Sequence, residues 1–267
     1  MLKDITLGQY FPGNTVAHRL DPRTKLILTI IYIVALFLAK NWFSYLLVLL
    51  SAAACFIITR VSFRAILRTM KPIVVIIVIT AILNMFLTKG EPIFSFWILS
   101  VSREGLKVAL FMAMRLILLI TFTFLLTFTT SPISLMDGLE TLLAPLKKIK
   151  LPVHELAMMM GIALRFIPTL IEETQKIMNA QKARGADFDT GSIVKRAKAM
   201  LPLLVPLFVS AFRRADELAV AMECRCYHGD KGRTRMKVLK MEARDFFALL
   251  LGAALLVCVV ILGRYGL

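Results

Sequence analysis

Residues 151–185 read LPVHELAMMMGIALRFIPTLIEETQKIMNAQKARG, and residues 201–229 read LPLLVPLFVSAFRRADELAVAMECRCYHG. Both runs open on a Leu-Pro pair, are apolar at first and become charged further on. Both also end in an arginine between two small residues, Ala183-Arg184-Gly185 in one and Cys224-Arg225-Cys226 in the other. This pattern predicts two long amphipathic helices, each with one half against a membrane and the other half in water.

The arginine that closes each run has two possible roles. The helix dipole stabilises a cation at a helix C-terminus, and Gly185 can adopt the left-handed conformation that ends a helix. Small neighbours would also let a guanidinium enter a partner's groove and form bidentate contacts there. Because the pattern occurs twice, we favour docking sites at Arg184 and Arg225.

Composition places the rest of the chain in a membrane. The 267 residues are 58% hydrophobic with a mean hydropathy of +0.77, whereas soluble domains are roughly 45–50% apolar. The sequence therefore predicts an all-α polytopic membrane protein with about five transmembrane helices plus long amphipathic cytosolic coupling helices. The predicted spans are two within 26–58, joined by a tight turn at Lys40-Asn41, and one each at 72–88, 106–130 and 245–262. For residues 26–58, one helix with a re-entrant segment is the alternative.

The spans divide the chain into three predicted parts. They are an N-terminal membrane domain at 1–130, a cytosolic coupling domain of amphipathic helices at 131–242, and a C-terminal transmembrane helix at 243–267. At the start of the first span, Asp21 is expected to cap a helix whose first residue is Pro22. In the second amphipathic run, Arg213 and Glu217 are four residues apart and can pair.

The net charge of +16 would suggest nucleic-acid binding in a soluble protein. With a cytoplasmic N-terminus, however, 27 of the 33 Lys and Arg residues lie in inner segments and 5 in outer ones. Cytoplasmic segments of membrane proteins carry such an excess, although a long inner domain weakens the argument. We therefore expect a multi-pass protein of the cell membrane that contacts the lipid bilayer and no nucleic acid.

The sequence offers little for catalysis or ion transport. Arg115 is the cation well inside an apolar run, and the spans before residue 131 contain no Asp or Glu, so a structural or partner-facing role is favoured over transport chemistry. No phosphate-binding loop or catalytic triad pattern occurs, which predicts a non-catalytic chain without a cofactor. Cys224, Cys226 and His228 suggest a metal site, but a structural zinc needs a fourth ligand, so no metal is expected.

Several short motifs, in order and at family-like spacing, resemble the transmembrane T component of energy-coupling factor transporters, the EcfT/CbiQ family. The resemblance covers essentially the whole chain. The motifs are Gly8-Gln9-Tyr10, His18 to Lys25, Thr130-Ser131-Pro132, Ala163 to Pro168, Gln181 to Gly185, Arg214 to Ala219 and Cys224-Arg225-Cys226. The last departs from Ala-Arg-Gly but keeps an arginine between small residues.

The resemblance implies a scaffold that transmits ATP-driven motion to a separate substrate-binding S component for vitamin or metal uptake. Two ABC ATPase subunits, EcfA and EcfA′, would bind ATP and Mg and would dock at the triplets around Arg184 and Arg225. One S component at a time, from an interchangeable set, would pack on the coupling helices. The residues expected to contact it are Met158, Met159, Met160, Phe166, Leu204 and Phe208. The alternative, a conventional ABC-type permease with its own substrate path, is disfavoured because the spans contain few polar residues.

Overall fold

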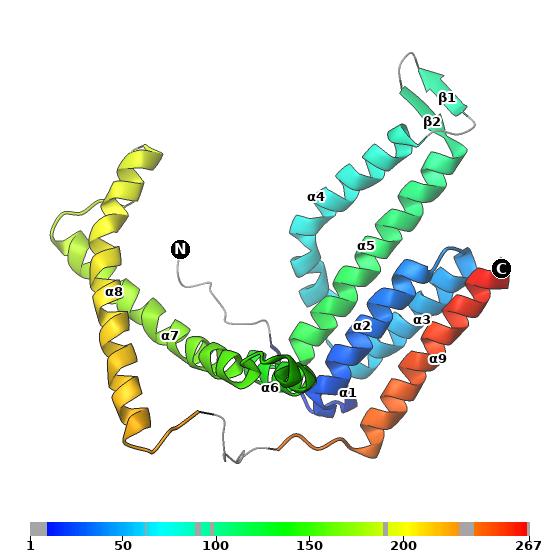
Figure 1. Ribbon diagram of the computed structural model, residues 1–267. Coiled ribbons are helices and arrows are strands. Elements are labelled where there is room, and N and C mark those ends of the chain that lie inside the picture. The colour runs from blue at the N-terminus through cyan, green and yellow to red at the C-terminus, as the bar shows by residue number, and fades with distance from the viewer. Residues whose placement is uncertain are drawn as a thin grey trace. The chain divides into compact units, whose positions relative to one another are not determined.

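The computed structural model describes residues 10–61, 63–88, 92–96, 99–188, 192–229 and 238–265, and within them the chain is helical apart from one short hairpin (Figure 1). Gly8-Gln9 of the first motif lies outside these residues. The described residues form two compact units. One comprises residues 10–139 and 239–265, and the other comprises residues 140–229.

The first unit is built from antiparallel helices. Its elements are α1 (Val16–Arg19), α2 (Pro22–Leu38), α3 (Trp42–Thr59), α4 (Phe63–Leu87), β1 (Pro92–Phe96), β2 (Leu99–Ser102), α5 (Arg103–Thr129) and α9 (Ala243–Tyr265), with α6 (Pro132–Leu143) leading to the second unit. Two helices separated at residues 39–41 confirm the turn predicted at Lys40-Asn41. The long helices α4 and α5 lie side by side and carry the antiparallel strands β1 and β2 at one end (Figure 1).

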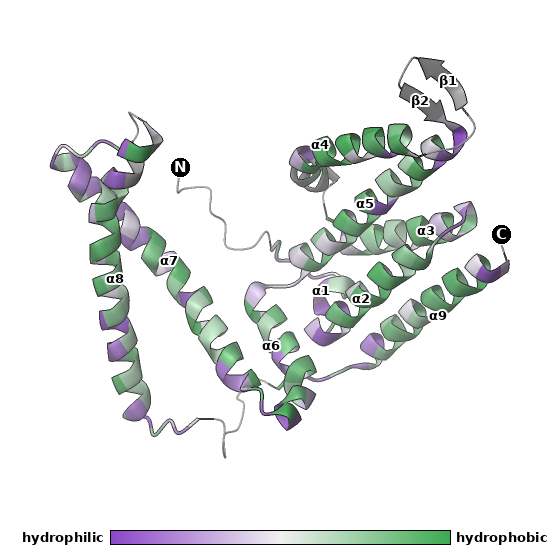
Figure 2. Ribbon diagram, turned by 45° about the horizontal axis from the view of Figure 1, so that its top comes forward, coloured by the Kyte–Doolittle hydropathy of each residue, from purple (hydrophilic) through white to green (hydrophobic). Residues whose placement is uncertain are grey.

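Within the described residues, five helices are long and apolar enough to cross a membrane. They are α3, residues 70–87 of α4, α5, α7 (Val153–Ala183) and α9. The polytopic prediction is confirmed, but the set differs from the predicted one, since α2, with 17 residues, is outside it and α7 is included. No more than 28% of the apolar window of any of these helices is buried within the protein. Figure 2 shows how hydrophobic the length of α9 is, and lipid would cover such a surface.

Aromatic stacking holds the first unit together. Tyr32 of α2 stacks on Phe122 of α5 with ring centroids 3.9 Å apart, and Tyr45 of α3 stacks on Phe111 of α5 at 5.0 Å. Around these rings, the buried core consists of Tyr32, Ala35, Leu36, Ala39, Tyr45, Val48, Ala52, Leu118 and Val259. Gly252 lets α9 approach α2, because a Cβ there would lie 2.5 Å from Leu28 Cδ2.

Arg115 has a structural role at the turn between α2 and α3. Its Nε donates to the Tyr45 hydroxyl at 3.0 Å, and its Nη2 donates to the carbonyl oxygen of Ala39 at 3.3 Å. Ala39 is the C-cap of α2, where carbonyl groups lack partners within the helix. The guanidinium also lies 5.4 Å from the centroid of the Phe37 ring. Arg115 therefore satisfies a helix end inside an apolar layer, which accounts for a cation at this position.

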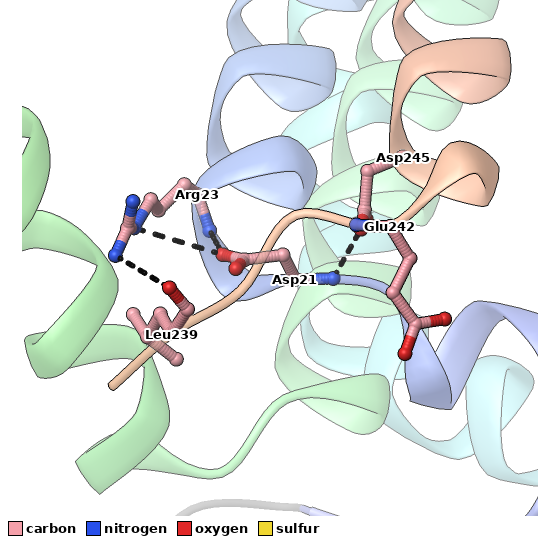
Figure 3. A network of polar contacts seen from close by, with 5 residues as sticks. All are labelled: Asp21, Arg23, Leu239, Glu242 and Asp245. Atoms are coloured by element: carbon pink, nitrogen blue, oxygen red, sulfur yellow. Dashed lines mark hydrogen bonds and ion pairs between the residues drawn. The ribbon is translucent and has the colours of Figure 1, made fainter. Parts of the chain in front are cut away.

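A polar cluster joins the start of α2 to the start of α9 (Figure 3). Asp21 Oδ1 accepts from the backbone N–H of Arg23 at 2.9 Å with Pro22 at the first helical position, which confirms the predicted cap. The Asp245 carboxylate accepts from the backbone N–H of Asp21, 224 residues away, and from that of Glu242, both at 2.8 Å. Asp245 is only 2% exposed. One buried carboxylate thus fixes the start of α2 to the start of the last helix of this unit.

Replacing Asp245 with alanine should lower the free energy of unfolding by about 2–4 kcal/mol, because two backbone N–H groups would lose their acceptor. Asp245→Asn keeps one acceptor oxygen and should cost less. The matched control is Glu242→Gln, since the contact of the Glu242 side chain among the described residues is an exposed ion pair with Arg244. Thermal unfolding in detergent measures the three variants. An Asp245→Ala midpoint equal to that of Glu242→Gln would contradict the role given to this carboxylate.

Candidate functional site

The second unit contains two helices of equal length. After a 3-10 turn, η1 (Ala144–Ile149), come α7 and α8 (Ile193–Glu223), each of 31 residues and therefore about 46 Å long. The start of α7 directly after Leu151-Pro152 confirms the prediction. The start predicted for the second helix near Leu201-Pro202 is wrong. The side chain of Ser192 caps an earlier start by accepting from the Lys195 N–H at 3.4 Å, and α8 continues through two prolines at exposed positions.

The C-terminus of α7 ends in a Schellman motif around Arg184. The N–H of Ala186 donates to the carbonyl of Gln181, and that of Gly185 donates to Lys182, both at 3.0 Å. Gly185 has φ +87°, so the left-handed conformation predicted for it is confirmed. Arg184 is the C-cap residue immediately before this turn.

The C-terminus of α8 repeats the same turn around Arg225. The N–H of Tyr227 donates to the carbonyl of Met222 at 3.1 Å, and that of Cys226 donates to Glu223 at 2.8 Å. Cys226 takes the left-handed position with φ +57°, where the first turn has glycine. Arg184 and Arg225 therefore occupy the same position in two copies of one backbone motif, and both are exposed.

This geometry adds a reason for the residue that follows each arginine. The sequence explained Gly185 and Cys226 as flanks that leave room for a partner, and the structure shows that both also reverse the chain at a helix end. A side chain in the left-handed region costs roughly 1–2 kcal/mol, so Cys226 is strained where Gly185 is not. The repeated hydrogen-bond pattern, which the sequence did not reveal at Cys226, sets the direction in which each arginine leaves its helix.

The cysteine and histidine groups near Arg225 have simple surroundings. The thiols of Cys224 and Cys226 are exposed and free, and His228 Nδ1 lies 2.8 Å from the carbonyl oxygen of Cys226. Among the described residues, no group of three or more His, Cys, Asp or Glu side chains is arranged to hold a metal ion. Cys224, Cys226 and His228 therefore belong to a hydrogen-bonded turn around the exposed side chain of Arg225.

An ion pair joins α7 to α8, which cross and contact each other (Figure 1). Arg214 Nη2 donates to Glu173 Oε2 at 2.6 Å, and both side chains are partly buried. The sequence had pointed to Arg213 and Glu217 instead, because spacing along one helix says nothing of a second helix. The Arg214–Glu173 pair was missed for that reason.

Most of the residues predicted to contact a membrane partner are accessible. Met159, Met160, Leu204 and Phe208 are exposed, with Phe208 at 61%, while Met158 is half-buried. Phe166 differs, because it is half-buried and lines a hollow between α7 and α8. One face of α8 is an open, mostly apolar surface that includes Phe208 and is formed by Val205, Phe208, Val209, Phe212, Arg213, Asp216, Glu217 and Val220. The second unit thus has a large apolar surface in addition to its two arginine ends.

Comparison with known proteins finds a match to the family described as cobalt transport protein, CbiQ, over residues 13–236. The energy-coupling factor transporter transmembrane protein EcfT of Clostridium kluyveri is 54% identical over 266 residues, which cover 99% of this chain and 98% of that protein. The proteins of the same name from Acidaminococcus fermentans and Bacillus subtilis are 51% and 50% identical, and the matches cover 100% and 92% of this chain and 99% and 93% of those proteins. The similarity therefore includes both units and both arginine ends.

Substitutions of the residues that follow the two arginines should have opposite effects on the stability of the two helix ends. Gly185→Ala should destabilise the α7 turn by about 1 kcal/mol, because nothing lies within 4 Å of the added Cβ and only the backbone strain remains. Cys226→Gly should stabilise the α8 turn by a similar amount. Amide hydrogen exchange at residues 184–186 and 225–227 measures both. Protection that changes in the same direction in the two variants would contradict the assignment of one motif to both ends.

Proposed function

Because this chain belongs to the EcfT/CbiQ family of energy-coupling factor transporter transmembrane proteins, we propose that it is the scaffold and coupling subunit of an ATP-driven importer. In this proposal the chain is not catalytic. Two partner ATPase subunits bind and hydrolyse ATP with Mg²⁺, and a separate S component binds a vitamin or a metal. The multi-pass membrane body holds the helices that transmit the motion between them.

The observation that carries this proposal is the pair of equivalent arginine ends. Arg184 and Arg225 have the same backbone setting, each at the end of a 31-residue helix, and both are exposed. Two similar soluble subunits could each receive one guanidinium in a similar groove. Arginine suits this task because its planar fork can bind a carboxylate or backbone carbonyl groups with two parallel hydrogen bonds.

The apolar surface of α7 and α8 supports binding of the S component. Met159, Leu204 and Phe208 lie outside the core and are 54%, 46% and 61% exposed. Methionine adapts its shape to different neighbours, which suits a surface shared by several interchangeable partners. In the complex, the S component would cover this surface.

The charge distribution supports an orientation in the cell membrane with a cytoplasmic N-terminus. The second unit, with its two arginine ends, would then face the compartment that holds ATP. Positive charge is typical of cytoplasmic segments. The ATPases would therefore reach Arg184 and Arg225 without crossing the bilayer.

Replacing both arginines, Arg184→Ala with Arg225→Ala, should abolish ATPase docking and uptake, while the membrane body still inserts. The double variant removes both charged contacts but leaves both turns intact, because the hydrogen bonds of those turns come from the backbone. Co-purification of the ATPases with the tagged chain is the measurement. The control is Arg264→Ala at the end of α9, which should bind normally. Wild-type uptake by the double variant would refute the docking role.

Met159→Asp should weaken binding of the S component more than binding of the ATPases, because it introduces a charge into the exposed apolar surface. Pull-downs of both partners from the same membranes measure the difference. Asn179→Asp adds the same charge to the polar half of α7, where Asn179 Oδ1 accepts from Gln175, and should affect neither partner strongly. Loss of the ATPases alone in Met159→Asp would show that the apolar half of α7 faces a different subunit.

A further inference from the structure

We infer that the ion pair between Glu173 and Arg214 is the pivot of the two coupling helices, and that it fixes the crossing of α7 and α8 and hence the separation of Arg184 and Arg225. The claim that ATPase subunits turn the helices about this pivot rests on the proposed function. The position of the pivot rests only on contacts within this chain.

The contact is strong for a pair outside a core. The distance from Arg214 Nη2 to Glu173 Oε2 is 2.6 Å, and the two side chains are 33% and 22% exposed. The exposed pair of Arg244 and Glu242, at 47% and 57%, joins residues two apart and restrains no second helix. Partial burial lowers the effective dielectric and reduces screening by salt, so Glu173 and Arg214 hold each other more firmly than surface charges do.

The pair also lies at matched positions in the two helices. Arg184 follows Glu173 by 11 residues, and Arg225 follows Arg214 by the same number. Both helices run without interruption from the ion pair to their last residues, Ala183 and Glu223. Each arm is therefore about 16 Å long. A rotation at the pair would move the two arginines by similar amounts, which two similar ATPase subunits would require.

The surroundings of the pair leave room for such a rotation. Beside it is a hollow of about 540 Å³ lined by Phe166, Ser210, Arg213, Arg214, Glu217 and Leu218. Interlocking side chains normally fix the angle between packed helices, and the hollow leaves this side of the crossing without them. In the chain alone the ion pair holds the crossing in one arrangement, and a force that a partner applies to the arms can turn the two helices about this point.

A distance measurement between the two arms tests the pivot. The native cysteines are replaced by serine, and Ala180→Cys on α7 and Ala221→Cys on α8, both at exposed positions, carry spin labels. Double electron–electron resonance then gives the distance distribution for the full chain in nanodiscs. The parent should give one narrow distribution. Glu173→Gln should raise the population of other distances roughly fivefold, and Glu173→Arg with Arg214→Glu should restore the narrow one.

The matched control is Glu172→Gln, the same substitution at the neighbouring exposed residue, which should leave the distribution unchanged. The inference is overturned if Glu173→Gln behaves like Glu172→Gln, or if the charge-swapped variant stays as broad as Glu173→Gln. The distance measurement needs only this chain, so it tests the pivot even if no ATPase co-purifies with the parent. Absence of a co-purifying ATPase would instead refute the proposed function.

The same labels test coupling in the assembled complex. Addition of Mg²⁺ and ATP should change the distance in the parent. In Glu173→Gln that change should fall to about half or less while ATP hydrolysis continues, because the arms would no longer share a fixed point. A merely structural role would lower docking and hydrolysis together. An ATP-driven change in Glu173→Gln equal to that of the parent would overturn the coupling role of the pair.

Discussion

The membrane body depends on one buried carboxylate. Asp245 lies in the first turn of α9 and accepts hydrogen bonds from the backbone of Asp21 and of Glu242, so a segment that follows the second unit in sequence is bonded to the start of α2. A buried charge is tolerated only when it is fully hydrogen-bonded or paired. The buried amine of Lys25, which donates to the carbonyl oxygen of Thr129 at 2.9 Å, ties the end of α5 to the same region. The starts of α2 and α9 and the end of α5 therefore form one connected base.

The second unit differs from the membrane body in its most prominent feature. It has two charged tips, the helix ends at Arg184 and Arg225. Each tip is built from a helix C-terminus whose free carbonyl groups are satisfied by the backbone of the following turn. The arginine of each tip is exposed. The Glu173–Arg214 pair connects the two helices where their apolar halves give way to charged ones, so the two tips belong to helices that are joined by an ion pair.

Much of this arrangement follows from local sequence. Asp21 before Pro22, the break at Lys40-Asn41 and the glycine after Arg184 each act within a few residues, and the structure confirms all three. The start of α8 was misplaced because two prolines outweighed a single capping serine at Ser192. The contacts of Asp245, Arg115 and Glu173 could not be predicted, because each joins segments brought together only by folding, and hydrophobic periodicity carries no information on which polar groups meet.

The exposed apolar side chains of α8 have a consequence for how the protein must be produced. Phe208 and Phe212 are 61% and 67% exposed, and a side chain of this size gains about 1.5–3 kcal/mol when it is fully buried. A chain synthesised in excess of its partners would leave these groups uncovered by protein, and exposed apolar surface favours aggregation and attracts chaperones and proteases. Balanced synthesis of the subunits is therefore as much a condition for a working complex as the fold itself.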